Sequence, residues 1–163
     1  MEVMFINIIN ASFEQVQGIG NAITLLQTFK SIARRESILR CMQNKEKHIH
    51  ILFVQYCSAL REQFDSCRRN PPLRKYEPKH AGAALWAQSL LDAVNEKWRQ
   101  MKTLNSSHEI HDIDSRSSFE KIGSTLIAFR SQRYKDWKDS LSTTNASDIL
   151  QRLDQVRKNL LYS

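Results

Sequence analysis

The stretch Asn70–Ala87, with the sequence NPPLRKYEPKHAGAALWA, decides how the chain is divided. It holds all three prolines of the chain: Pro71, Pro72 and Pro78. Proline has no backbone N–H to donate, and it disfavours the helical conformation in the residue before it. Gly82 then stands among alanines, so that another backbone can approach this point closely. We therefore predict a rigid hinge over residues 70–81 and a new helix from about Gly82.

A long helix is predicted on each side of this hinge. Residues 37–69 contain no helix breaker, and their apolar residues recur mainly at intervals of three and four, the spacing of one helical face. These residues are Ile38, Met42, Ile49, Leu52, Tyr56, Leu60, Phe64 and Cys67, with Lys45 at the position that the row skips. Phe53 and Ala59 widen the face, so this helix is expected to pack against more than one neighbour. Residues 82–104 carry one apolar face as well: Trp86, Leu90, Val94, Trp98 and Met101.

Three further helices are predicted, over residues 13–33, 117–140 and 147–161. The first has one apolar face, formed by Phe13, Val16, Ile19, Ile23, Leu26, Phe29 and Ala33. Gly18 and Gly20 weaken its first half, so its firm part is expected from about Asn21. In the second, Ser117 and Glu120 have the spacing of a capping box, which places a helix start after a polar loop at 105–116. The third has apolar residues at intervals of four, three and four: Ile149, Leu153, Val156 and Leu160.

The first ten residues are compatible with a short strand or with a disordered lead-in, and the sequence leaves both open. With only 4 glycines and 3 prolines, the chain has few turn formers and favours long helices. We therefore predict an all-α protein, an elongated bundle of four to five helices with a proline hinge between two long helices. Residues 1–163 are expected to form a single helical region.

The chain is basic, with 24 Lys and Arg against 17 Asp and Glu and a net charge of +7. Such a balance suits nucleic acid, an anionic surface or an acidic protein partner. The basic residues are spread along the chain and interleaved with acidic ones, and the densest stretch, Arg61–Lys79, flanks the hinge. A solvated basic surface is therefore the first interpretation, an acidic protein partner the second and nucleic acid the third.

The three cysteines, Cys41, Cys57 and Cys67, show no Cys-x-x-Cys spacing. They are expected to be reduced, buried or half-buried thiols, as in a cytosolic protein. The apolar start of the chain lacks a basic leader and is too short to span a bilayer. Neither a secretion signal nor a membrane segment is expected.

No catalytic, cofactor-binding or metal-binding pattern is found. Five possible metal ligands lie close together: His108, Glu109, His111, Asp112 and Asp114. Their histidines are three residues apart where the helical zinc motif needs four, so a solvated acidic loop is expected. His48 and His50 fall on different helical faces, and His80 has no nucleophile beside it in the sequence. No Gly-x-x-x-x-Gly-Lys-Ser/Thr loop is present to bind nucleotide phosphates.

The chain has three tryptophans: Trp86, Trp98 and Trp137. Each is placed by the helical spacing on an apolar face, where core packing is favoured over a role in contacting a partner.

The hinge has a particular order of residues: Asn-Pro-Pro-Leu, a polar spacer, Pro-x-x-Ala-Gly-Ala and then Leu-Trp-Ala. This order resembles the N-terminal tail region of dynein heavy chains. The matching residues are Asn70, Pro71, Pro72, Leu73, Pro78, Ala81, Gly82, Leu85, Trp86 and Ala87. Residues 22–29 and the aromatic segment formed by Phe129 and residues 134–137 extend the resemblance over most of the chain. The family usually has a proline shortly after Leu-Trp-Ala, where this chain has residues 95–98, so the helix is expected to continue straighter here.

The resemblance implies a non-catalytic tail segment that acts in heavy-chain association and in binding intermediate and light-intermediate chains for microtubule-based movement. It implies a location in the cytoplasm and cytoskeleton, in the axoneme of a cilium, with no small-molecule substrate, cofactor or membrane. By the same analogy, residues 61–87 and the long helix before them belong to the assembly surface. Two alternatives remain: a basic helical module that binds nucleic acid or serves as a general scaffold, and an enzyme built on the His108–Asp114 cluster.

Overall fold

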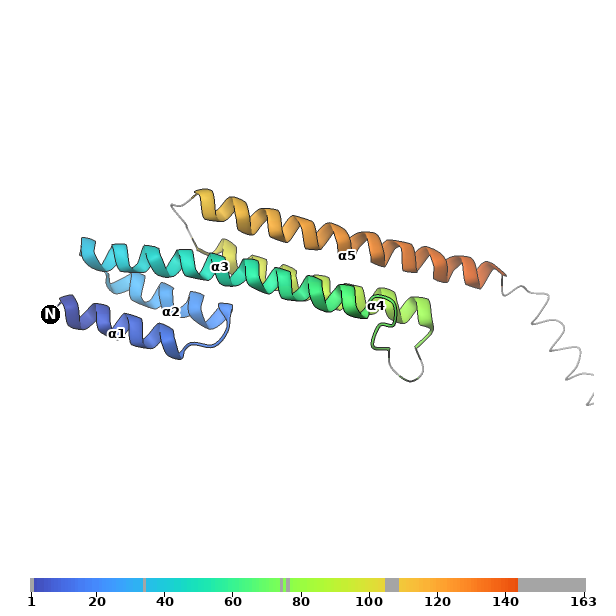
Figure 1. Cartoon of the computed structure of the whole chain (residues 1–163), viewed down its shortest axis with the longest axis horizontal. Helices are drawn as coiled ribbons and strands as arrows, with labels where there is room; N and C mark the ends of the chain where they lie inside the picture. Colours follow the sequence, from blue (N-terminus) through green and yellow to red (C-terminus); the bar gives the residue numbers. More distant parts are fainter. Residues whose placement is uncertain (1, 34, 74, 76, 105–108, 144–163) are drawn as a thin grey trace, which may run out of the picture.

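The computed structural model describes residues 2–33, 35–73, 75, 77–104 and 109–143, without the side chains of residues 32, 109–111, 142 and 143. In these ranges the chain forms α-helices and no strand: α1 (Glu2–Gln15), α2 (Ile19–Ile32), α3 (Glu36–Cys67), α4 (Lys79–Lys102) and α5 (Glu109–Thr143). The all-α prediction is confirmed, and the molecule is elongated (Figure 1). The helix predicted over residues 147–161 lies outside the described residues.

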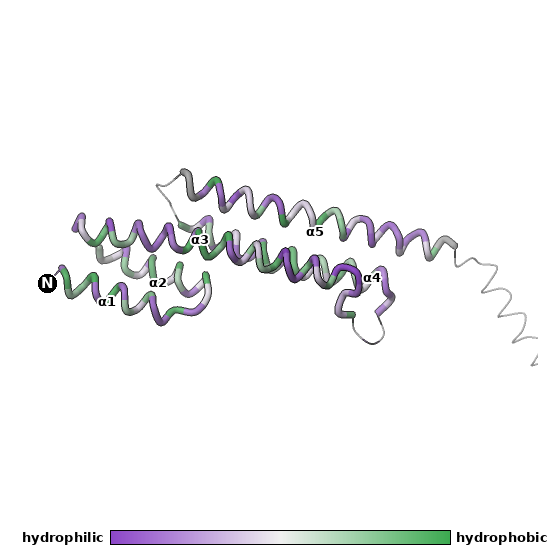
Figure 2. The backbone as a smooth tube through the Cα atoms, viewed as in Figure 1, coloured by the Kyte–Doolittle hydropathy of each residue, from purple (hydrophilic) through white to green (hydrophobic). Residues whose placement is uncertain are grey.

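Helices α3, α4 and α5 run along the length of the molecule and form its central three-helix bundle (Figure 1). Each is antiparallel to the one before it, so α5 runs in the same direction as α3. Hydrophobic and hydrophilic residues alternate along the helices, as expected of amphipathic helices packed on one another (Figure 2). Buried apolar residues from all three helices fill the centre: Phe53, Cys57, Leu60, Phe64, Leu90, Leu91, Val94, Ile122 and Leu126.

Two aromatic layers cross this bundle, and each takes one ring from each helix. The hinge-end layer consists of Phe64, Trp86 and Phe129. The far layer consists of Phe53, Trp98 and Phe119. The α3 member of each layer, Phe64 or Phe53, is fully buried. Because one ring from each helix meets in each layer, the two layers fix how the three helices are aligned along their axes.

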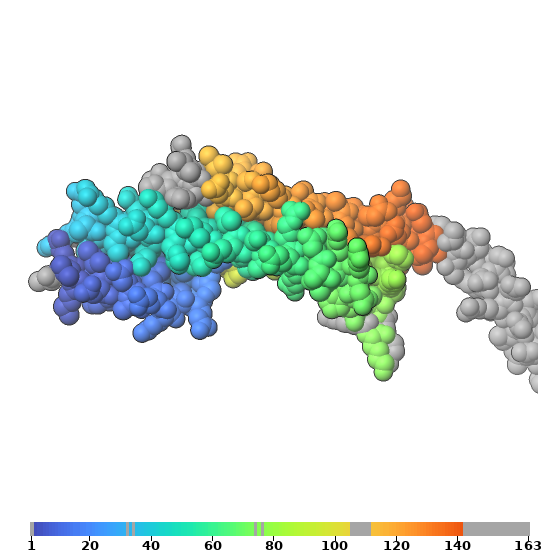
Figure 3. Space-filling model, in the orientation of Figure 1, coloured from blue at the N-terminus to red at the C-terminus, as the bar shows by residue number. Residues whose placement is uncertain are grey.

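Helices α1 and α2 form a hairpin that covers only the first half of α3 (Figures 1 and 3). Ile9 of α1 and Leu26 of α2 are fully buried, and the rings of Phe5 and Phe29 meet edge to face at 6.2 Å. Gln27 of α2 also donates a hydrogen bond to Thr103, just past α4, at 3.0 Å. At its far end the bundle therefore has a fourth helix, α2, which the hinge end lacks.

The expectation of a strand or a disordered lead-in over the first ten residues is wrong, because α1 begins at Glu2. The helix expected over residues 13–33 is divided as well, since α1 ends at Gln15 and α2 begins at Ile19. The break falls at Gly18, whose φ of +87° is one that L side chains rarely adopt. The segment is helical because Phe5, Ile9 and Phe13 recur every four residues and pack against the core.

The capping box predicted at Ser117 and Glu120 is also wrong, because α5 begins at Glu109 and both residues lie inside it. Glu120 pairs instead with Arg116 one turn earlier, at 2.9 Å. Ser115 is fully buried and is followed on the core side by Phe119 and Ile122. A single inward residue per turn is enough to hold this polar stretch in a helix, although its composition favours a loop.

The bounds of the two long helices differ slightly from the prediction. Helix α3 covers Glu36–Cys67, against the predicted 37–69, and α4 covers Lys79–Lys102, against the predicted 82–104. The helix start at Lys79 shortens the hinge predicted over 70–81, because a proline at 78 is well tolerated as the residue that begins a helix. Helix α4 continues without a break through residues 95–98, as expected.

The apolar face predicted for α3 is rotated in part. Leu52 and Tyr56 are only half-buried, whereas Phe53 and Cys57, one position further along, are buried. At the position that the apolar row skips, Lys45 is half-buried with its ammonium over the Phe13 ring, and Glu46 is the buried residue. The reason is that α3 packs against α2 on one side and against α4 and α5 on the other, so its buried face is wider than one row.

Candidate assembly surface

The hinge begins where α3 runs into Pro71 and Pro72. The last turns are closed by the backbone N–H of Arg68, which donates to the carbonyl of Phe64 at 2.8 Å, and by that of Asn70, which donates to Cys67 at 3.0 Å. The two prolines that follow have no N–H with which to continue this pattern. The chain then projects from the side of the bundle before α4 starts, as the space-filling view shows (Figure 3).

Gly82 explains why small residues follow Pro78. Its N–H donates to the carbonyl of Pro78 at 2.7 Å, which closes the first turn of α4. A Cβ at this position would lie 2.9 Å from Leu73 Cδ2 and 3.1 Å from Glu77 Cβ. The hinge therefore folds back onto the first turn of α4, and only glycine leaves room for it.

The hinge-end layer begins one helical turn after Gly82, at Trp86 of α4. The ring of Trp86 stacks on Phe64, with centroids 5.7 Å apart and planes inclined by 13°. Phe129 meets Phe64 at 5.1 Å and Trp86 at 6.2 Å, both edge to face. The Arg133 guanidinium lies 5.0 Å from the centre of the Phe129 ring, so that a cation covers the layer. The side chain of Trp86 thus packs inside the bundle.

The residues that resemble the dynein tail differ in exposure and form three groups. Gly82 and Ala87 are buried, and Trp86 is packed in the hinge-end layer. Four others are exposed: Asn70, Pro72, Pro78 and Leu85. Leu73, Pro71 and Ala81 are half-buried. The exposed group is therefore available to a partner, whereas the buried group shapes the hinge.

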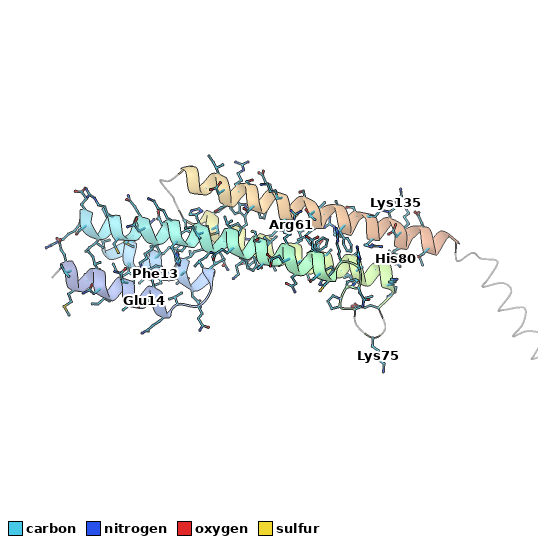
Figure 4. The ribbon with its side chains drawn as sticks, viewed as in Figure 1. Phe13, Glu14, Arg61, Lys75, His80 and Lys135 are labelled. Atoms are coloured by element: carbon cyan, nitrogen blue, oxygen red, sulfur yellow. The ribbon has the colours of Figure 1, made fainter. Side chains whose placement is uncertain are left out.

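Basic residues surround this part of the molecule. Figure 4 shows Lys75 at the tip of the hinge and Arg61 on α3. Arg61 and Arg68 lie 3.8 and 3.7 Å from the same carboxylate, that of Asp65. Exposed pairs of this kind add little to the free energy of unfolding. The basic residues thus contribute positive charge to the surface of the hinge end, and they contribute little to its stability.

The three histidines whose side chains are described, His48, His50 and His80, are not grouped at one site. His48 is exposed, and the Nδ1 of the buried His50 shares a 2.8 Å hydrogen bond with Ser115 of α5. His80 Nδ1 lies 3.9 Å from an Asp136 oxygen. In the cluster of possible metal ligands, His108 lies outside the described residues. The side chains of Glu109 and His111 are also not described. Asp112 and Asp114 are exposed. Within the described ranges, no three His, Cys, Asp or Glu side chains are grouped so that they could hold a metal ion.

The cysteines are free thiols, and Cys57 is buried while Cys41 and Cys67 are half-buried. Burial raises the pKa of the Cys57 thiol to about 11, because the apolar surroundings disfavour the thiolate. Such a thiol is inert at neutral pH. Cys57 therefore belongs to the core.

Two buried polar contacts were not predicted from the sequence. Lys30 of α2 forms an ion pair with the buried Glu46 of α3, and His50 of α3 bonds Ser115 of α5. The sequence carries a signal for the first, since Glu46 lies four residues after Met42 and three before Ile49. It carries none for the second, because the pairing of α3 with α5 is not visible in local spacing.

No helix in the described part of the chain is both long and apolar enough to cross a membrane. What the geometry defines is an elongated helical bundle with an exposed hinge and with aromatic layers inside it.

The sequence comparisons identify this segment. A family model described as dynein heavy chain, N-terminal region 1, matches residues 1–162, and the chain belongs to this family. The chain is 25% identical over 158 residues to dynein axonemal heavy chain 2 of Mus musculus, which covers 94% of this chain and 3% of the relative. It is 23% identical over 146 residues to the dynein gamma chain of the flagellar outer arm of Chlamydomonas reinhardtii, covering 90% of this chain and 3% of that protein.

A third relative is the dynein-1-beta heavy chain of the flagellar inner arm I1 complex of the same alga, 23% identical over 153 residues. The chain thus spans about 3% of the length of these curated relatives. The matched part is the N-terminal, non-motor region of a dynein heavy chain. The family resemblance stated from the hinge residues is confirmed.

Proposed function

We propose that the chain is a non-catalytic assembly segment of a dynein heavy-chain tail. It associates with other heavy chains, binds intermediate and light-intermediate chains, and acts in the axoneme of a cilium. The observation that carries this proposal is the match of the N-terminal heavy-chain region to residues 1–162. The names of the relatives, which are axonemal and flagellar dyneins, support the location.

The exposed residues of the hinge end form the proposed contact surface. Leu85 is 61% exposed, and it lies next to Trp86, whose ring turns into the hinge-end layer. Pro72 and Pro78 are exposed beside it on the projecting hinge. A rigid, partly apolar projection loses little conformational entropy when a partner binds it. The basic residues around it favour partners with acidic surfaces.

Sedimentation velocity tests this proposal. The 163-residue chain is mixed in turn with purified dynein intermediate chain, light-intermediate chain and heavy-chain tail. We expect at least one mixture to sediment as a complex, and we expect Leu85→Glu to weaken that complex. The matched control is Ile51→Glu, which places the same charge at an exposed apolar position of α3 away from the hinge. If no subunit forms a complex with the folded chain, the proposed assembly role is wrong.

The nucleic-acid alternative gains no support from the arrangement of charges. Several exposed arginines are paired with a carboxylate on their own helix, as in Arg99 with Glu96 and Arg116 with Glu120. Trp86 and Trp98 stack on phenylalanines inside the bundle and do not present their faces to bases. The half-buried Trp137 and the exposed Tyr134 lie beside Arg130 on α5 and are open to a base, so the alternative stays a hypothesis based on net charge and on these two rings.

A further inference from the structure

A second surface lies on α4 and α5, next to the hinge. A groove of about 340 Å³ runs along the edge where these helices meet, and its lining is almost wholly apolar. Its walls include Ala84, Leu85 and Gln88 of α4 and Arg130, Tyr134 and Trp137 of α5. The small side chains of α4 leave the space, and the two aromatic rings of α5, 5.8 Å apart, form the opposite wall.

Exposed apolar residues continue the groove along α5. Ile127, Tyr134 and Leu141 follow one another at intervals of seven and are 45%, 57% and 57% exposed. An apolar row with this period is the pattern along which a second helix packs in a left-handed crossing. Large apolar side chains exposed together in this way mark an interaction site. The shape and the period both indicate a helical occupant.

Arg130 supplies the chemical specificity. It is half-buried within the apolar lining, and its guanidinium donates a hydrogen bond to Gln88 Oε1, a neutral acceptor. No carboxylate of the described residues forms an ion pair with it. A guanidinium has five N–H donors in a planar fork that fits a carboxylate through two bonds at once. Arg130 therefore has donors to offer to an acidic side chain that enters the groove.

The charges around the groove also favour an acidic occupant. Lys135 follows Tyr134 on α5, and Figure 4 shows it on the outer side of that helix. The nearby Asp136 is already engaged on the other side, with Arg133 at 3.3 Å and His80 at 3.9 Å. A second copy of this chain would bring the same cations against one another, on a molecule with a net charge of +7.

We propose that the groove between α4 and α5 binds an amphipathic helix of a partner protein, one that carries an Asp or Glu within its apolar face to pair with Arg130. The inference rests on the proposed assembly role for its biological setting. Leu85 belongs to both surfaces, but Arg130 belongs to the groove alone, and the groove can be tested through Arg130 without any dynein subunit, so the two proposals can fail independently. A peptide can bind the groove when no subunit forms a complex, and a subunit can bind through the hinge when no peptide enters the groove.

Fluorescence anisotropy with two labelled synthetic peptides tests it. The peptides are helical, share the same leucine face and differ only in carrying Glu or Lys beside it. We expect the Glu peptide to bind the 163-residue chain roughly tenfold more tightly, and Arg130→Gln to remove most of that preference. Leu85→Ser should weaken both peptides by a similar factor. The control is Lys121→Gln, which removes an exposed cation of α5 outside the groove lining and should change neither affinity.

Circular dichroism and thermal melting establish that each variant is folded. Equal binding of the two peptides, or an unchanged preference in Arg130→Gln, would show that the groove does not select a carboxylate. Sedimentation over a range of protein concentrations tests whether the groove binds a second copy of this chain instead. If the chain dimerises and Leu85→Ser makes it monomeric, the occupant is another copy of this chain and the proposal is overturned.

Discussion

The two aromatic layers are built alike but have different surroundings. In the far layer Trp98 stacks on Phe119, with centroids 4.9 Å apart, and in the hinge-end layer Trp86 stacks on Phe64 at 5.7 Å. A cation lies over each layer, Lys102 at 5.9 Å from the Trp98 ring and Arg133 at 5.0 Å from the Phe129 ring.

The difference lies in what covers each layer. Helix α2 packs beside α3 and α4 at the far end, whereas the hinge end has three helices, an open groove and an exposed projection. Similar aromatic layers thus have different surroundings. The far layer is part of a four-helix core, and the hinge-end layer lies beneath the exposed hinge and the groove.

The largest expected difference between the layers is in stability. Phe53 and Phe64 are both fully buried on α3, and each change to alanine should lower the free energy of unfolding by about 3–5 kcal/mol. We expect Phe53→Ala to cost the more, because α2 packs beside α3 and α4 at this end and the helices there cannot close on the cavity as readily. Chemical denaturation followed by far-UV circular dichroism measures both. A larger loss for Phe64→Ala would mean that the hinge end is the tighter half.

The next effect concerns the hydrogen bond between His50 and Ser115, which ties α3 to α5 at the far end only. Both side chains are buried, so Ser115→Ala should lower the free energy of unfolding by about 1–3 kcal/mol. The matched control is Ser131→Ala, at an exposed position of the same helix. It should change the stability by less than about 0.5 kcal/mol. Equal effects of the two changes would contradict the role given to this bond.

Glycine substitutions should act in opposite directions at two positions. Gly82→Ala should destabilise the chain by about 1 kcal/mol, because its Cβ would lie 2.9 Å from Leu73 and the hinge would have to shift. Gly123→Ala should stabilise it by about 0.5–1 kcal/mol, since nothing lies within 4 Å of the added Cβ and alanine favours a helix. Thermal melting of both variants gives the sign. If Gly82→Ala also raised the melting temperature, the close packing of the hinge on α4 would be refuted.

The smallest expected effect is chemical and leaves the fold intact. Burial raises the pKa of Cys57 from 9.0 to about 11, so the folded chain favours the protonated thiol, and the thiolate forms only as the pH approaches 11. Iodoacetamide at pH 8 should therefore modify the half-buried Cys41 and Cys67 well before Cys57. Peptide mass spectrometry after timed quenching measures the three rates. Cys57 reacting as fast as the other two would show that the middle of α3 is open to solvent.

The sequence predicts α3 and α4 well because their signals are local. The prolines after Asn70 and the apolar spacing of α3 and α4 place both helices within a few residues of their observed bounds. The family could also be inferred from the hinge residues. Helical spacing further explains why Trp86 faces inward and Leu85 outward, since neighbouring residues on a helix point in directions about 100° apart.

What the sequence could not show depends on contacts between distant segments. Helix α1 looked like a strand or a lead-in because the segment is short and its burial comes from packing against α2 and α3, although Phe5, Ile9 and Phe13 do recur at helical spacing. The polar start of α5 looked like a loop because the partner of Ser115 is His50, 65 residues away. The groove at Arg130 becomes visible only when Leu85 and Tyr134 are brought together by the antiparallel pairing of α4 and α5.

The central claim is that the hinge end, and not the α1–α2 hairpin, is the assembly surface. Hydrogen–deuterium exchange on the complex with a dynein subunit tests it most directly, by comparing free and bound chain peptide by peptide. We expect slower exchange on binding in residues 79–88 and 130–141, with little change in residues 2–32. Slower exchange confined to residues 2–32 would contradict it.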